Sequence, residues 1–100
     1  MKTLLCIFLS LYTLSCNALD CPPKEVDQVQ SEASGNLLVR LKDQNWHSLG
    51  NASSPGVREM FSIILSAQAQ GKLVVIRYPD GYDCNAYDIA TPAQMVRLYN

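Results

Sequence analysis

The chain has 100 residues, a net charge of −1 at pH 7 and 17% charged residues. Acidic and basic side chains are mixed along it, so the basic patch that drives nucleic-acid binding is missing. We therefore expect no nucleic-acid partner. A chain of this length holds one small domain with a limited core.

The N-terminal stretch has the pattern of a secretory signal peptide. An apolar run over residues 4–14 follows a single charged residue, which is typical of such signals. A bilayer span needs about 20 residues, so we expect no stable membrane span. Small side chains at Cys16 and Ala18 predict cleavage after Ala18, with a signal over residues 1–18 and one exported domain over 19–100. The protein would then be periplasmic or secreted, unless Cys16 is instead lipidated.

Two cysteines remain in the predicted exported part, Cys21 and Cys84. An exported chain enters an oxidising compartment, where two cysteines have one possible pairing. The sequence therefore predicts a Cys21–Cys84 disulfide. The alternative is that Cys84 is a free thiol or a metal ligand.

The first half of the exported part is expected to contain a β-hairpin. Residues 21–35 are polar and begin with two prolines, which favours an extended arm. The β-rich run 36–42, the turn residues 43–45 and the short run 46–50 predict two paired strands. Trp46, on the second strand, is expected to cover one end of the core.

The clearest predicted helix follows this hairpin. Its apolar stripe has helical spacing and consists of Val57, Met60, Phe61, Ile64 and Leu65. Ser53 or Ser54 is expected to cap the helix, with Pro55 in its first turn. Gly71 is expected to end it in the left-handed conformation.

The C-terminal part predicts two more strands. Residues 73–78 are apolar on both faces, so this strand should be central in a sheet. Asp80 and Gly81 predict a turn, and residues 93–99 predict the last strand. The order of elements predicts an α+β domain, in which one helix packs on a small antiparallel sheet.

Catalytic and metal sites find little support in the residue pattern. Nucleophilic catalysis needs a base, and the single histidine, His47, reads as an exposed strand residue. Asp80, Asp83 and Asp88 lack the alternating spacing of a calcium loop, and Cys84 has no nearby zinc partner. We expect no enzyme activity, no metal and no cofactor.

The segment YPDGYDCNAYD, residues 78–88, allows two interpretations. It is first a turn that the disulfide ties to the N-terminal arm. It also carries the flat aromatic and hydrogen-bonding side chains that bind sugars or protein surfaces. The candidate binding residues are Trp46, Tyr78, Tyr82, Asp83, Asn85 and Tyr87.

Asn51 begins the triplet NAS, which is an N-glycosylation acceptor in cells that glycosylate exported chains.

The order of a strand with Trp46, the run REMFSIILSAQAQGKLVVIRY, a loop with a cysteine and a final apolar strand resembles a known family. It is similar to the small exported B subunits of subtilase cytotoxin and its pertussis-like and typhoid-toxin relatives. The resemblance extends from Trp46 to about Cys84. It implies an OB-type partial barrel and glycan binding by a pentamer. The chain is shorter than those subunits and lacks their second disulfide, so no sugar-contacting residue is carried over and a homo-oligomer has no further support.

These observations predict a small exported, non-enzymatic binding module with a glycan or protein partner. The alternative is a structural or accessory periplasmic subunit, or a lipoprotein, without a ligand site of its own.

Overall fold

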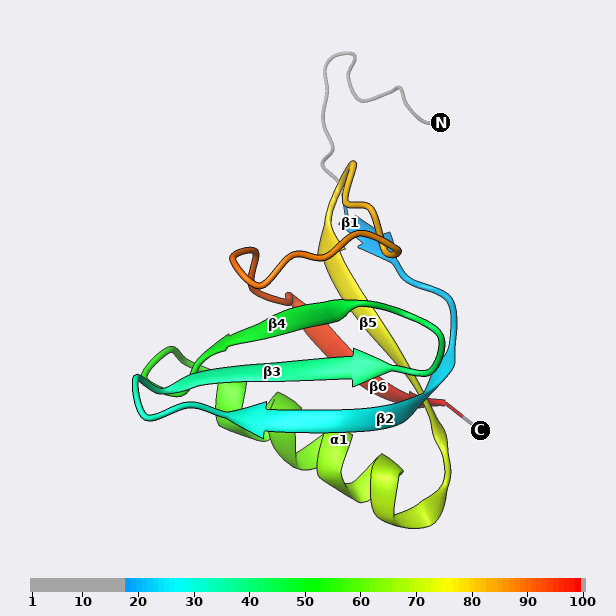
Figure 1. The fold of residues 1–100 in the computed structure, drawn as a ribbon, viewed down its shortest axis with the longest axis horizontal. Helices are drawn as coiled ribbons and strands as arrows, with labels where there is room; N and C mark the ends of the chain where they lie inside the picture. Colours follow the sequence, from blue (N-terminus) through cyan, green and yellow to red (C-terminus); the bar gives the residue numbers. More distant parts are fainter. Residues whose placement is uncertain (1–17, 100) are drawn as a thin grey trace.

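A computed structural model describes residues 18–99 of the chain. Its elements, in chain order, are β1 (Ala18–Asp20), β2 (Lys24–Ser31), β3 (Asn36–Leu41), β4 (Trp46–Asn51), α1 (Val57–Gln70), β5 (Leu73–Pro79) and β6 (Met95–Tyr99). Within these residues the predicted α+β fold is confirmed, with one antiparallel sheet and one helix (Figure 1), and Cys21 and Cys84 form a disulfide. The apolar run of the predicted signal peptide lies outside the described residues.

The sheet is built around β5, as its apolar sequence predicts. Strands follow the order β1-β5-β2-β3-β4, and β6 pairs with the other edge of β5. β2 belongs to two pairings: Lys24 and Glu25 pair with β5, whereas the residues from Val26 onward pair with β3. The sheet therefore bends along β2. Among the described strands, β4 and β6 are not paired with each other, so the sheet stays open.

The prediction of a polar arm before the hairpin is wrong, because most of residues 21–35 form strand β2. Only Val26 and Val29 of β2 pack against the core, and most of the other side chains are exposed. The strand is formed because β3 and β5 both offer a free edge to its backbone. That pairing is tertiary and leaves little trace in side-chain pattern.

The helix occupies its predicted place, but its N-terminus differs from the prediction. Gly56 is the N-cap, with φ 81°, and no side chain caps the helix. Ser53 is unavailable for capping because its N–H and its hydroxyl both donate to Oδ1 of Asn51. At the other end, Gly71 takes the predicted left-handed conformation, with φ 67°.

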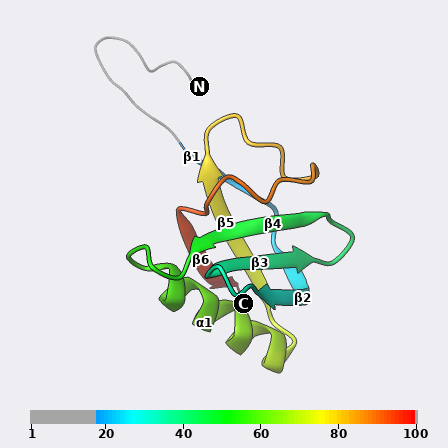
Figure 2. The same ribbon diagram turned by 60° about the vertical axis from the view of Figure 1, so that its left-hand side comes forward.

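The core lies between α1 and one face of the sheet (Figure 2). Val57 and Ile64 of the predicted stripe are buried, and Met60 and Phe61 pack against them. Leu65 was predicted to be buried but is 42% exposed, and the fully buried Ala67 lies toward the core instead. The apolar stripe is therefore rotated relative to the prediction.

One glycine is required by the packing of the helix on the hairpin. Gly50 has φ 125°, and a Cβ placed there would lie 2.9 Å from Cγ2 of Val57. A side chain at this position would therefore collide with the first turn of α1 and would also strain the backbone.

Candidate functional site

Residues 80–94 connect β5 to β6 and are called the tyrosine loop below. The first part of the loop lies at the opposite end of the molecule from α1 in both ribbon views (Figures 1 and 2), whereas its last residues return toward β6 and the start of α1. Its central anchor is the predicted disulfide, which is confirmed: Cys21 and Cys84 are bonded, with a Cα–Cα distance of 5.8 Å. Cys21 is itself fixed to the sheet, since its N–H donates to the carbonyl of Ile76 at 2.9 Å.

Hydrogen bonds tie the tyrosine loop to the hairpin on its other side. Nδ2 of Asn45 donates to the carbonyl of Asn85 at 2.8 Å. The N–H of Asp88 donates to the carbonyl of Trp46 at 3.2 Å, next to an isolated parallel bridge between Asp88 and His47. The loop is thus attached at several points along its length in this conformation.

Asp88 also shapes the second half of the loop. Its carboxylate accepts the N–H groups of Ala90 and Thr91, at 2.9 and 3.0 Å, and the hydroxyl of Thr91 at 2.9 Å. The backbone N–H groups of Thr91 and Ala90 hold the pKa of Asp88 below its usual 3.8. Asp88 is therefore a turn-forming residue. Among the described residues, no group of three or more acidic, histidine or cysteine side chains is placed to hold a metal ion.

A buried cluster of rings lies under the loop. The rings of Tyr78 and Tyr82 stack with centroids 4.0 Å apart, and the ring of His47 lies 5.5 Å from that of Tyr82. The hydroxyl of Tyr78 donates to the carbonyl of Ser48 at 2.8 Å. Nδ1 of His47 is hydrogen-bonded to the hydroxyl of Tyr82. The cluster joins β4, β5 and the tyrosine loop into one packed unit.

The expectation that His47 is an exposed strand residue is wrong. His47 is 3% exposed, because it pairs with Val39 of β3 and therefore lies on the core face of the hairpin. Burial lowers the pKa of His47 below its ordinary value of 6.5. The carbonyl of Cys84 and the carboxylates of Asp88 and Asp83 oppose this effect.

Burial also keeps both clustered tyrosines neutral. It raises the pKa of Tyr82 to about 12, with a further contribution from the negative charge of Asp88. It raises the pKa of Tyr78 still more strongly. Around neutral pH the cluster therefore consists of neutral hydrogen-bonding rings.

The structure separates the six candidate binding residues into two groups. Tyr78 is 1% exposed and belongs to the core, so its side chain is not available to a ligand. Tyr82 is half-buried and its hydroxyl is engaged by His47. Trp46 is half-buried, and it is joined to the loop through its backbone carbonyl.

The second group is exposed on the loop. Tyr87 is 62% exposed, and Asp83 and Asn85 are exposed beside it in the sequence. One carboxylate oxygen of Asp83 accepts the N–H of Asn85 at 2.9 Å. Ile89, which the sequence reading did not select, is 40% exposed on the same loop. The exposure of Ile89 could not be inferred from the sequence, because isoleucine side chains are normally buried.

Asn51 is a structural residue in this fold. Its Nδ2 donates to the carbonyl of Ser34 and to Oδ1 of Asn36, both at 3.1 Å. Its Oδ1 accepts from Ser53, so both ends of the amide are occupied. A glycan on Nδ2 would replace one of the two N–H groups that join the β2–β3 turn to the end of β4.

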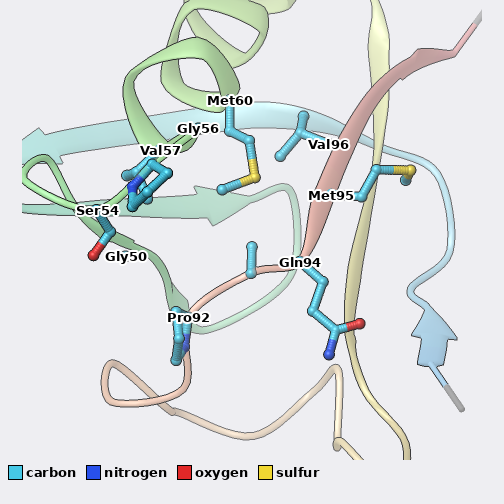
Figure 3. A pocket seen from close by; sticks show the side chains of 11 residues that line it. Gly50, Ser54, Gly56, Val57, Met60, Pro92, Gln94, Met95 and Val96 are labelled. Carbon is cyan, nitrogen blue, oxygen red and sulfur yellow. The ribbon is translucent and has the colours of Figure 1, made fainter. Parts of the chain in front are cut away.

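A separate pocket of about 460 Å³ lies between the start of α1, the end of β4 and the segment before β6 (Figure 3). Met60 extends from α1 into it, and Pro92 and Gln94 border it from the other side. None of the six candidate binding residues lines this pocket.

Comparisons with known protein families, with curated proteins and with solved structures gave no match. The resemblance to toxin B subunits stays a prediction. Within the described residues, no helix is long and apolar enough to cross a membrane.

Proposed function

We propose that the protein is a small exported, non-enzymatic binding module that contacts a glycan through the outer surface of the tyrosine loop. The observation that carries the proposal is an exposed aromatic side chain on an anchored loop. Tyr87 is 62% exposed, although the loop around it is held by a disulfide and by hydrogen bonds to the hairpin. A fixed loop loses little conformational entropy when a ligand binds.

The residues around Tyr87 suit a sugar better than a purely apolar ligand. A tyrosine ring offers a flat apolar face and a polar hydroxyl. The exposed side-chain amide of Asn85 makes no hydrogen bond within the described residues, and Asp83 retains a second carboxylate oxygen. Sugar hydroxyls both donate and accept hydrogen bonds, and these groups supply partners for both roles.

Two features support the remaining parts of the proposal. The disulfide favours export, because such bonds form and persist in oxidising compartments. The burial of the single histidine supports a non-enzymatic role, since His47 is 3% exposed and cannot reach a substrate in this conformation.

The proposal is tested by screening the full chain, exported in an oxidising host, on a glycan array. The decisive variant is Tyr87→Ala, and Tyr99→Ala is the matched control because Tyr99 is also exposed, at 44%, but ends β6 outside the loop. We expect Tyr87→Ala to weaken binding of the selected glycan by at least tenfold. Tyr99→Ala should leave the affinity unchanged, and both variants should keep the melting temperature of the wild type.

Other outcomes separate the alternatives. If the wild type and Tyr87→Ala bind the glycan equally well, the loop is not part of the binding site. If no glycan binds and the exported protein instead copurifies with a partner chain in a fixed ratio, the accessory-subunit alternative takes its place. If the mass of the exported protein includes a lipid on Cys16, the lipoprotein alternative replaces the predicted cleavage after Ala18.

A further inference from the structure

The tyrosine loop covers a histidine that has one nitrogen without a partner. His47 is 3% exposed, and its Nε2 is buried with no hydrogen bond within the described residues. The carbonyl of Cys84 favours the charged imidazole but forms no hydrogen bond of normal geometry with Nε2. Of the residues that face the ring of His47, Tyr82 and Cys84 belong to the tyrosine loop and Tyr78 belongs to β5. A movement of that loop would therefore bring water to the imidazole.

The hydrogen bond between His47 and Tyr82 is suited to a neutral imidazole. A neutral ring whose proton is on Nε2 leaves a lone pair on Nδ1, and this lone pair accepts the hydroxyl hydrogen of Tyr82. A protonated ring carries hydrogen on both nitrogens, so Nδ1 no longer accepts. Protonation thus reverses this bond: Nδ1–H then donates to the hydroxyl oxygen of Tyr82, and the hydroxyl hydrogen of Tyr82 needs another acceptor.

The groups that face His47 compensate only part of the cost of a buried charge. Tyr78 from β5 and Tyr82 from the loop present neutral rings. Asp88 and Asp83, also in the loop, and the carbonyl of Cys84 attract the charged form. Neither aspartate makes an ion pair with His47 within the described residues, and desolvation is the larger effect. Opening the loop would hydrate the cation and remove that penalty.

We propose that His47 is an acid switch for the tyrosine loop, which stays closed at neutral pH and opens when His47 is protonated. This inference rests on the proposed function in one respect only: if the loop carries the ligand surface, acid should release the ligand. The switch itself concerns the loop and His47 and does not depend on the ligand.

The direction follows from linkage between protonation and opening. The closed state holds the pKa of His47 below 6.5, whereas a solvated imidazole has a pKa close to 6.5. The open state therefore binds more protons between these two values. Closure is fully favoured above pH 6.5, and it weakens as the pH falls, by at most about tenfold per pH unit for one proton. Below the pKa of the closed state the effect levels off.

The first experiment uses the wild-type chain and proton NMR. His47 is the single histidine, so its ring resonances are assigned without mutation. We expect them to titrate below pH 6.5, and the ring resonances of Tyr82 to change with the same midpoint. A titration midpoint at or above 6.5, or tyrosine resonances that stay constant through it, would overturn the proposal.

The second experiment measures how fast a phosphine reductant cleaves the Cys21–Cys84 disulfide between pH 7.5 and 4.5. Cys21 is 4% exposed and Cys84 is half-buried, so we expect attack to be slow in the closed state and faster when the loop moves away from β4. The comparison is His47→Asn, which keeps an acceptor near Nδ1 but cannot be protonated in this range. The ratio of the wild-type rate to the variant rate cancels the reagent's own pH dependence. We expect this ratio to be constant above pH 6.5 and to rise at least threefold below it; a constant ratio throughout would contradict the switch.

If His47→Asn fails to fold, the wild-type rate is compared with that of an unstructured peptide disulfide, which corrects for the reagent's pH dependence in the same way. The ligand arm comes last: affinity for the selected glycan should fall between pH 7 and pH 5 in the wild type. If the loop opens in acid but Tyr87→Ala does not change glycan binding, the switch is supported and the proposed function is refuted. If the loop stays closed in acid but Tyr87→Ala loses glycan binding, the proposed function is supported and the switch is refuted.

Discussion

Reduction of the Cys21–Cys84 disulfide should lower the free energy of unfolding by about 4 kcal/mol. The two cysteines are 63 positions apart in the sequence. Cross-linking a loop of that length restricts the unfolded chain by roughly 14 cal/mol/K, which is about 4 kcal/mol at 25 °C. Small domains have total stabilities of about 5–15 kcal/mol, so the reduced protein should be only marginally folded.

The assay is urea unfolding followed by the fluorescence of Trp46, for the oxidised protein, the reduced protein and the variant Cys21→Ala/Cys84→Ala. The reduced protein keeps both sulfur atoms, so its difference from the oxidised form isolates the cross-link. The alanine variant also loses the packing of the buried Cys21 side chain and should be less stable again, by about 1 kcal/mol. If the reduced protein is within about 1 kcal/mol of the oxidised one, the unfolded chain is already restricted without the bond and the reasoning fails.

Three further changes test other parts of the structure. Tyr78→Phe keeps the ring but removes the donor to the buried carbonyl of Ser48, so urea unfolding should show a loss of about 1–2 kcal/mol; an unchanged midpoint would mean that the hydroxyl contributes nothing. Asn51→Ala removes the hydrogen bonds that join the β2–β3 turn to β4 and should cost about 2 kcal/mol in the same assay. A neutral result there would show that Asn51 is dispensable and free for glycosylation. Asp88 has a pKa held below 3.8 in the folded state, so its contribution is present above pH 3.8 and is lost as the pH falls through the lowered value. Thermal melts between pH 5 and 2.5 should therefore show a larger loss for the wild type than for Asp88→Asn, whereas parallel curves would argue against that contribution.

The candidate site was only partly predictable. Residue types identified the segment around Cys84 as a loop with aromatic and polar side chains, and the exposure of Tyr87 suits that hypothesis. Residue types could not tell Tyr87 from Tyr78, which is buried. The difference is positional: Tyr78 lies on the core face of β5, whereas Tyr87 lies near the middle of a loop. His47 was misplaced for a related reason, because its face depends on its register with β3.

Local features of the sequence by themselves determined the helix, the hairpin, the central strand and the disulfide. Each depends on residues that are close together or on a pairing with one solution: the spacing of Val57 and Ile64, the left-handed Gly71, and the two cysteines of the predicted exported part. Tertiary structure alone decided that the polar residues of β2 form a strand, because β3 and β5 supply its hydrogen bonds. It also decided that His47 is buried beneath Tyr82, since those two residues are 35 positions apart and meet only when the loop closes over β4. The pattern of side chains along the chain predicts local structure. Burial of a polar ring depends instead on which distant segment of the chain covers it.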